Sequence, residues 1–286
     1  MMDLAVSVWT SYFVDLSPEE MVDEFAAAGY TAAEFSDEHG FVMLQRAKER
    51  SLTPVEVGAE LKAYADARGV SFPQGHLYLA VDLCADDAVE ILTDWLDLYN
   101  ALGIRSAVLH ASGGRELTPE QRFDRWVKAL VPLTDHLKGT ELSIALENVG
   151  TTPNAEALNR LIDAVGDEHL GICLDTGHFH LACAAGQADY SQKEFIRRAG
   201  KRLIALHIAD NDTSRDQHLM PFGGGTVNWQ DVMQGLREVG YSRLFNYENP
   251  GERRASLPVR RAKLDYIRVI TKELFSDEFA ENGSKY

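Results

Sequence analysis

Cysteine is scarce in this chain of 286 residues. The three cysteines, Cys84, Cys173 and Cys183, are irregularly spaced, and no CxxC motif occurs. An odd number of cysteines with irregular spacing suits a reducing compartment rather than a disulfide framework. We therefore expect unpaired thiols and a cytoplasmic protein.

Long hydrophobic runs are absent as well. The N-terminal stretch MMDLAVSVWTSYF has neither a basic start nor a long apolar core, so it lacks the pattern of a signal peptide. No apolar run approaches the ~20 residues that a helix needs to cross a bilayer. We expect no membrane partner.

Positive charge is in deficit, because 28 Lys and Arg residues stand against 44 Asp and Glu residues and leave a formal net charge of −16. Such a chain repels nucleic acid, so we expect no nucleic-acid partner. Hydrophobic residues make up 45% of the chain, which is enough to bury a large core. Because no linker is evident, we expect one domain over residues 1–275 and a polar, frayed tail over residues 276–286.

Eight short runs rich in strand-forming residues recur along the chain. They are Leu4–Trp9, Ala32–Phe35, Val70–His76, Ser106–His110, Leu142–Glu147, Gly171–Asp175, Leu203–His207 and Leu244–Glu248. The later runs are almost wholly apolar up to their last residue, which is typical of parallel strands buried on both faces. Their ends are about 34 residues apart on average, the length of one βα unit in a barrel of this size.

Helix signals separate these runs. Ser17, Thr53 and Thr118 each precede a proline and are followed three residues later by Glu or Gln, which predicts a capped helix start. One glycine falls near the end of each of seven predicted helices, where a left-handed residue is often needed. These glycines are Gly29, Gly69, Gly103, Gly139, Gly166, Gly200 and Gly240.

The alternation predicts an α/β protein with a single (β/α)8 barrel, the TIM-barrel fold. A doubly wound open sheet is the alternative, but the first run lacks the glycine fingerprint that usually follows the first strand of that fold. The segment Ser36–Leu52 is longer than an ordinary βα loop, so we expect a lid or a short extra helix there.

Six consecutive strands end in a side chain that can bind a metal ion. These residues are His76, His110, Glu147, Asp175, His207 and Glu248. One such residue is most simply a hydrogen-bonded polar group, but six in succession are hard to explain by packing, and the active sites of barrels lie at this end of the strands.

Three carboxylates that converge in one buried cavity require a cation, because an unpaired buried charge is costly. We therefore expect Glu147, Asp175, His207 and Glu248 to hold one divalent metal ion. Their mainly oxygen donors suit Mn²⁺ first, with Mg²⁺, Co²⁺ and Zn²⁺ as alternatives.

The segments ALENVG, GICLDTGHFHLA, LHIADND and HLMPFGGGTVNW resemble the xylose isomerase-like barrel superfamily, and the resemblance covers nearly the whole chain. It implies a metal-dependent sugar or cyclitol isomerase or epimerase of the ketose 3-epimerase or inosose type. In that branch the four residues named above bind the metal, and Glu147 and Glu248 also exchange the substrate proton. The resemblance further implies a substrate contact by His178 and an arginine role for Arg215, whose spacing departs from the family pattern.

Endonuclease IV-type relatives give a second interpretation. Their trinuclear zinc site uses residues that match His76, His110, Glu147, Asp175, His178, His207, Asp216, His218 and Glu248. Asp216 and His218 are therefore candidates for a second metal site, or for hydrogen bonds within their own loop. The charge of −16 and the missing glycine-rich N-terminal segment speak against DNA cleavage.

The expected reaction is proton transfer next to a carbonyl, with a metal-stabilised enediolate as intermediate. The same base and metal could instead expel a substituent from a 3-keto sugar by β-elimination, as a lyase or deglycosidase does. A catalytically silent sugar-binding barrel is a further alternative, which the intact ligand set disfavours. Barrels of this type often form homodimers or homotetramers.

Four further residues are candidates for the substrate pocket. His76 and His110 are expected to line the substrate pocket. Trp9 and Phe35 end the first two strands and form either an apolar wall against a sugar ring or ordinary barrel packing.

Overall fold

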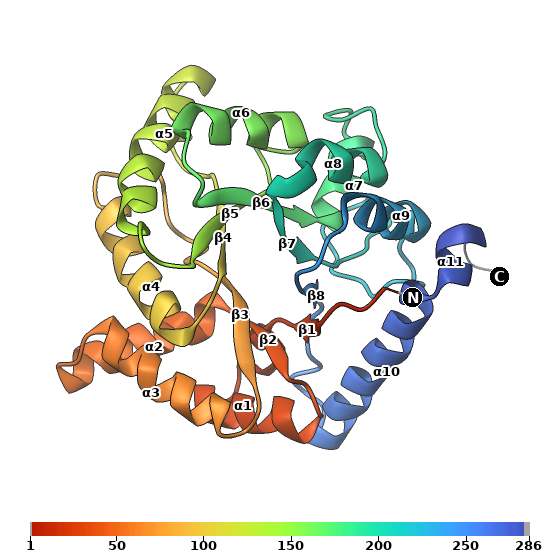
Figure 1. Cartoon of the computed structure of the whole chain (residues 1–286), viewed down its shortest axis with the longest axis horizontal. Helices are drawn as coiled ribbons and strands as arrows, with labels where there is room; N and C mark the ends of the chain where they lie inside the picture. The colour runs from red at the N-terminus through yellow and green to blue at the C-terminus, as the bar shows by residue number, and fades with distance from the viewer. Residues whose placement is uncertain (1, 283–286) are drawn as a thin grey trace.

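Parallel strands form a ring at the centre of the computed structural model, which describes residues 2–282 (Figure 1). Within these residues the strands are β1 Val6–Val8, β2 Ala32–Phe35, β3 Ser71–His76, β4 Ser106–His110, β5 Ser143–Glu147, β6 Leu170–Asp175, β7 Leu203–His207 and β8 Phe245–Tyr247. Strands β2 to β7 form one six-stranded sheet in sequence order, and β1 pairs with β8. Every strand overlaps its predicted run.

Single bridges join the two sheets into a closed barrel. Trp9 pairs with Glu34 between β1 and β2, and Ile208 pairs with Tyr247 between β7 and β8. The second junction is secured by the N–H of Ile208, which donates to the carbonyl of Asn246 at 2.8 Å. The predicted (β/α)8 barrel is therefore confirmed.

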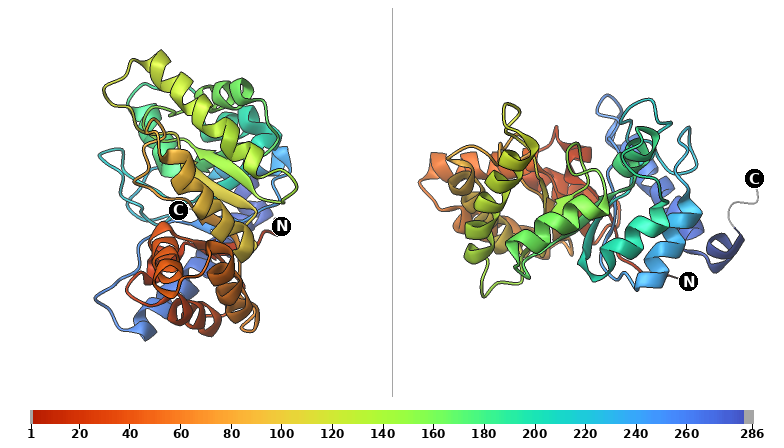
Figure 2. Two further views of the ribbon diagram at one scale, coloured as in Figure 1. Left: turned by 90° about the vertical axis from the view of Figure 1, so that its left-hand side faces the viewer. Right: turned by 90° about the horizontal axis from the view of Figure 1, so that it is seen from above.

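Helices surround the strand ring on the outside (Figures 1 and 2). They are η1 Thr10–Phe13, α1 Pro18–Ala27, α2 Asp37–Arg50, α3 Pro54–Asp66, α4 Ala88–Leu102, α5 Pro119–His136, α6 Ala155–Val165, α7 Thr176–Ala184, α8 Gln192–Ala199, η2 Gly200–Arg202, α9 Trp229–Val239, α10 Leu257–Phe275 and α11 Asp277–Asn282. In the part of the chain that the structure describes, no helix has the length and apolarity that a membrane span requires.

The predicted helix-start and helix-end residues lie at or near the ends of helices in the structure. Ser17, Thr53 and Thr118 each form a complete capping box at the start of α1, α3 and α5. All seven predicted helix-ending glycines have a positive φ, between 53° and 84°. A positive φ favours glycine, because a Cβ atom causes steric strain in that conformation. The three cysteines are unpaired.

Two expectations about segments are resolved. The segment Ser36–Leu52 contains the helix α2 rather than a loop-like lid. The expectation of a frayed tail from residue 276 is wrong for residues 277–282, which form α11. Phe279 and Ala280 are buried in that helix, and Phe279 packs edge-to-face on Phe222 with ring centroids 5.4 Å apart. Residues 283–286 of the tail lie outside the described residues.

Arg260 ties α10 to the loop after η1, near the seam where β1 meets β8. It is the largest fully buried side chain, and its guanidinium donates to both carboxylate oxygens of Asp15, at 2.8 and 2.9 Å. The same group donates to the carbonyl of Tyr12. Hydrogen bonds from Arg260 outweigh partial burial and hold the pKa of Asp15 below its usual value.

We predict that Asp15→Asn lowers the free energy of unfolding at pH 7 by about 1 kcal/mol, a modest figure because the Asp15 side chain is 40% exposed to screening solvent. A lowered carboxyl pKa stabilises the fold above the unfolded-state pKa, and that contribution is lost as the pH falls through the folded-state pKa. The difference between the variant and the parent should therefore shrink below about pH 4 in urea titrations.

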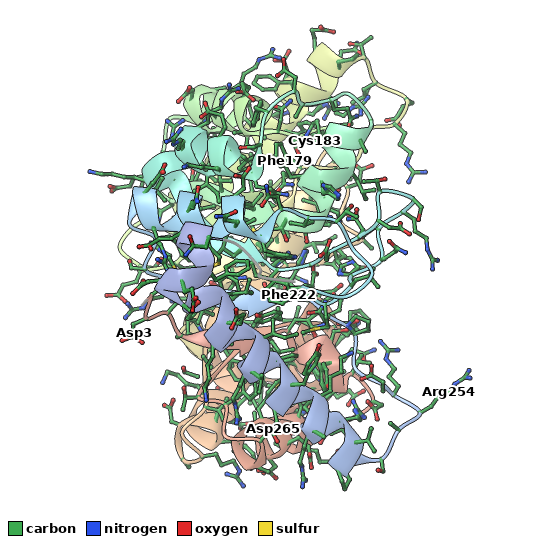
Figure 3. All side chains as sticks on the ribbon, turned by 90° about the vertical axis from the view of Figure 1, so that its right-hand side faces the viewer. Asp3, Phe179, Cys183, Phe222, Arg254 and Asp265 are labelled. Atoms are coloured by element: carbon green, nitrogen blue, oxygen red, sulfur yellow. The ribbon has the colours of Figure 1, made fainter. Side chains whose placement is uncertain are left out.

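The matched control is Asp265→Asn, because Asp265 pairs with Arg268 on the exposed side of α10 (Figure 3). This control should change stability by less than 0.5 kcal/mol, as exposed pairs ordinarily do. An Asp15→Asn effect that is the same at pH 3 and pH 7 would contradict the role assigned to this pair.

Candidate metal centre

The six predicted strand ends meet inside the barrel. Successive side chains on a strand point to opposite faces, so residues two apart share the interior. Six side chains occupy the top interior layer, at the carboxyl ends of β3 to β8: His76, His110, Glu147, Asp175, His207 and Glu248. All are buried except His110, which is half-buried.

Glu147, Asp175, His207 and Glu248 fall into overlapping groups of possible metal ligands, in which Glu147 joins His207 in one group and Asp175 in another. His207 Nδ1 lies 3.3 Å from Glu147 Oε2 and 3.4 Å from Glu248 Oε2. One ligand atom each from Asp175, His207 and Glu248 also lie within 4.8 Å of one another. The spacing suits donors that share one ion.

Each of these four residues has a buried atom without a hydrogen bond. Among residues 2–282, these atoms are Glu147 Oε1, Asp175 Oδ2, His207 Nδ1 and Glu248 Oε2. Glu147 Oε1 lies 2.8 Å from His178 Nδ1, but the two atoms do not form a hydrogen bond. A buried polar atom without a partner costs about 1–3 kcal/mol, and more when it is charged. A divalent cation would satisfy all four, so the residues fit a metal ion.

The two glutamates have opposite pKa shifts. Burial raises the pKa of Glu248 to about 8, despite the opposing effect of His207 and His218. Burial also disfavours the ionised form of Glu147, but His110 and His207 outweigh it and hold its pKa well below the usual range. A cation would relieve the desolvation of Glu248.

Glu34 orients His207, and the sequence reasoning missed it. Glu34 is fully buried on β2, and its Oε1 accepts a hydrogen bond from His207 Nε2 at 2.8 Å. Gln74 donates to the same oxygen at 2.9 Å, and Asn246 donates to Glu34 Oε2. With the proton of His207 on Nε2, Nδ1 is left free to bind a metal, which is a common arrangement around metal-bound histidines.

Asn148 holds Asp175 in a similar way. Its amide donates to the carbonyl of Asp175 at 2.9 Å and accepts from the N–H of Asp175 at 2.7 Å. Asp175 Oδ1 caps α7 by accepting from the N–H of His178 at 2.6 Å. These bonds leave Oδ2 as the available oxygen of Asp175.

His76 and His110 form a second candidate metal-binding group with Glu147. His110 Nε2 lies 3.0 Å from Glu147 Oε2, and His76 Nε2 lies 3.5 Å from the same oxygen. His76 Nδ1 is 2.7 Å from the carbonyl of Leu77, which keeps Nε2 facing the centre. The three ligand atoms lie within 4.8 Å of one another.

Asp216 and His218 lie at the outer side of the centre. Asp216 Oδ2 is 3.0 Å from His218 Nε2 and 3.2 Å from His178 Nε2. Burial opposes ionisation of Asp216, but the two imidazoles hold its pKa well below the usual range. Burial lowers the pKa of His218, and the Asp216 hydrogen bond outweighs this effect and raises it to about 10.

Of the remaining predicted residues, Trp9 lies at the site, whereas Phe35 and Arg215 do not contact it. Trp9 lies at the site, where its ring stacks on His218 with centroids 5.8 Å apart. Phe35 does not line the site, because Glu34 takes the inward position on β2 and Phe35 packs against Phe72 and Tyr99. Arg215 is exposed and makes no hydrogen bond or ion pair to the described part of the chain.

The chain belongs to the xylose isomerase-like TIM barrel family, whose sequence profile matches residues 22–269. It is 25% identical over 261 residues to a D-psicose 3-epimerase from Enterocloster bolteae, covering 82% of this chain and 76% of that protein. It is 32% identical over 198 residues to a probable endonuclease 4 from Mycoplasma pneumoniae, covering 64% of this chain and 67% of that protein. The chain spans about half the length of an uncharacterised relative from Sinorhizobium fredii, with 29% identity over 58% of this chain and 53% of that protein.

Solved structures share the fold. The structure of L-ribulose 3-epimerase superposes with a TM-score of 0.75 at 18% identity, over 98% of this chain and 96% of the other. The structure of 3-keto-D-glucoside 4-epimerase from E. coli superposes with a TM-score of 0.72 at 16% identity, over 93% of this chain and all of the other. A sugar epimerase is thus among the sequence relatives, and sugar epimerases are among the solved structures that share the fold.

We predict that metal binding at the four-residue centre stabilises the protein. After dialysis against EDTA, adding Mn²⁺ at about 100 times its dissociation constant should contribute roughly 2.7 kcal/mol and raise the Tm by several degrees. Asp175→Asn should abolish this rise, because it removes a charged ligand but keeps an oxygen for the helix cap. Differential scanning calorimetry measures both effects.

The control for this experiment is Asp212→Asn, which changes an exposed aspartate in the loop after β7. This variant should respond to Mn²⁺ as the parent does. An equal rise in the Asp175→Asn variant would show that the ion binds elsewhere.

Proposed function

We propose that the protein is a divalent-metal-dependent isomerase or epimerase whose substrate is a sugar, a cyclitol or a keto-sugar. The observation that carries the proposal is the convergence of four buried donor residues, Glu147, Asp175, His207 and Glu248, each with an atom that lacks a hydrogen bond. Membership of the xylose isomerase-like family and the epimerases among the relatives support it. The charge of −16 agrees with a small-molecule substrate rather than nucleic acid or a membrane.

The four residues would hold one ion, for which we propose Mn²⁺ first and Mg²⁺, Co²⁺ or Zn²⁺ as alternatives. When bound, such an ion supplies Lewis-acid polarisation of a substrate carbonyl, worth several kcal/mol of charge stabilisation. Glu34 and Asn148 keep His207 and Asp175 in place, so little reorganisation is needed when the substrate arrives.

Glu147 and Glu248 would move the proton. They extend from β5 and from the end of β8, two strands that are separated by β6 and β7 around the ring. One glutamate removes the proton from the carbon next to the carbonyl. The other returns it from the opposite face, which inverts the stereocentre, or to the neighbouring carbon, which gives an aldose–ketose isomer. Each positioned acid or base contributes roughly 10²–10⁴-fold to the rate.

The surrounding side chains would bind and orient the substrate. His178 and His110 present imidazole nitrogens beside Glu147, at 2.8 and 3.0 Å from its oxygens. His76 lies deeper in the same group, and Trp9 supplies an apolar face next to His218. We also assign a substrate contact to Arg215. It lies in an exposed loop and would reach the substrate only if that loop closed.

Phosphodiester hydrolysis is the second candidate function. The observation that favours it is the set of neighbouring donor groups beyond the central four: His76 and His110 with Glu147, and Asp216 with His178 and His218. Probable endonuclease 4 proteins among the relatives support it. The metal content of the purified protein distinguishes the two functions, with about one ion per chain expected for the isomerase and three zinc ions for the phosphodiesterase.

We predict that the protein incorporates deuterium from heavy water into the carbon next to the carbonyl of a ketose or inosose. Glu248→Gln should reduce the exchange rate by at least 10²-fold, because the amide cannot accept or return the proton. Nuclear magnetic resonance of the recovered substrate measures the exchange, and the circular dichroism of the variant checks its fold.

Glu252→Gln is the matched control, because Glu252 is exposed in the loop that follows Glu248 and pairs with Lys263. This variant should exchange at the parental rate. Absence of deuterium exchange with every ketose and inosose tested would refute the isomerase proposal. Release of a substituent from a 3-keto glycoside, with no epimer formed, would replace it with the lyase alternative.

A further inference from the structure

An open cavity of about 530 Å³ lies beside the metal centre, between the loops that follow β3, β4 and β5. Its lining includes His110 of the centre and the arginines Arg115 and Arg122. A neighbouring cavity of about 380 Å³ shares Arg122 and adds Arg160. Three arginines therefore line two neighbouring cavities, one of which adjoins the site, although the chain as a whole is strongly acidic.

These arginines have no carboxylate partner among residues 2–282. Arg122 Nε is buried without a hydrogen bond, and its guanidinium makes only one long bond, 3.4 Å from Nη2 to the carbonyl of Leu117. Arg160 stacks on the ring of Phe123 at 4.2 Å instead of pairing with an acid. One turn further along α5, Arg125 forms an ion pair with Asp86, with 3.4 Å between Nη1 and Oδ1. In a chain with 44 acidic residues, a lack of available carboxylates does not explain the unpaired state of Arg122.

The acidic side chains in the lining of the 530 Å³ cavity form no ion pair with the arginines. Asp82 is held by the loop backbone, because its Oδ1 accepts from the N–H groups of Cys84 at 2.8 Å and Gly114 at 3.1 Å. Gly113 permits this approach, since a Cβ there would lie 1.8 Å from Asp82 Oδ1. The other acid, Glu116, is exposed and forms no ion pair with Arg115 or Arg122. The loop is thus built around Asp82 and leaves the guanidinium groups available.

We propose that Arg122, with Arg115, binds an oxyanion at the distal end of the substrate while the carbonyl end lies at the metal centre. The substrate class is then an acidic sugar or cyclitol derivative that carries a carboxylate or a phosphate. Guanidinium groups match both oxyanions with paired N–H donors. In a protein with a charge of −16, guanidinium groups that are free of ion pairs would allow an anion to compete with a neutral sugar. This inference rests on the proposed sugar isomerase or epimerase function and narrows its substrate.

The test measures binding rather than turnover. Fructose, fructose 6-phosphate and fructuronate share a carbonyl end and differ at carbon 6, and isothermal titration calorimetry compares their affinities with and without Mn²⁺. At least one of the two anions should bind about tenfold more tightly than fructose. Arg122→Gln should weaken the binding of that anion by about ten- to hundredfold and leave fructose binding unchanged. The anion whose binding depends on Arg122 shows whether the site takes a phosphate or a carboxylate.

Arg125→Gln is the control, because Arg125 is on the same helix but pairs with Asp86 and does not line the cavity. It should bind all three ligands as the parent does. Equal binding of the neutral and anionic sugars, binding of none of the anions, or an Arg122→Gln variant that behaves like the parent would each overturn the inference. Arg122-dependent anion binding without deuterium exchange would count against the proposed function alone, and exchange of neutral fructose without an anion preference would count against this inference alone.

Discussion

The proposed site depends on four donor atoms that are buried at one end of the barrel without a hydrogen bond. Glu147 Oε1, Asp175 Oδ2, His207 Nδ1 and Glu248 Oε2 lack hydrogen bonds among residues 2–282. Folding removes these atoms from water, at a cost that the rest of the barrel must offset. A cation bound by all four residues would offset that cost. The same burial raises the pKa of Glu248 to about 8.

The layer below the centre explains how these atoms are held. Towards β1, β2, β3 and β8 the interior is polar, and Glu34 connects His207, Gln74 and Asn246 in one buried hydrogen-bond network. Towards β4 to β7 the interior is a small apolar cluster formed by Val108, Ala145, Cys173, Ile204 and Ala205. The polar half of this layer fixes the orientation of His207, and the apolar half excludes water from the space below the centre. Glu34 therefore belongs to the site although it does not face the substrate.

The sequence predicted the barrel and the six strand-end residues because both follow from local patterns. Strand ends, capping boxes and helix-ending glycines depend on neighbours in the chain. Glu34 was missed because the last residue of the second strand, Phe35, was taken as the inward-facing one, and a shift of one residue exchanges the inward and outward faces. A charged residue within the apolar run Ala32–Phe35 was the available signal. The unpaired state of Arg122 could not be predicted, since it depends on where every carboxylate lies in the folded chain.

The central claim is that Glu147, Asp175, His207 and Glu248 bind one divalent ion. The most direct test is X-ray diffraction from crystals grown with Mn²⁺, recorded on both sides of the manganese absorption edge. We expect an anomalous peak within about 2.0–2.3 Å of one atom from each of the four residues, with His207 bound through Nδ1. A peak at another place, or none at full Mn²⁺ occupancy by mass spectrometry, would contradict the account.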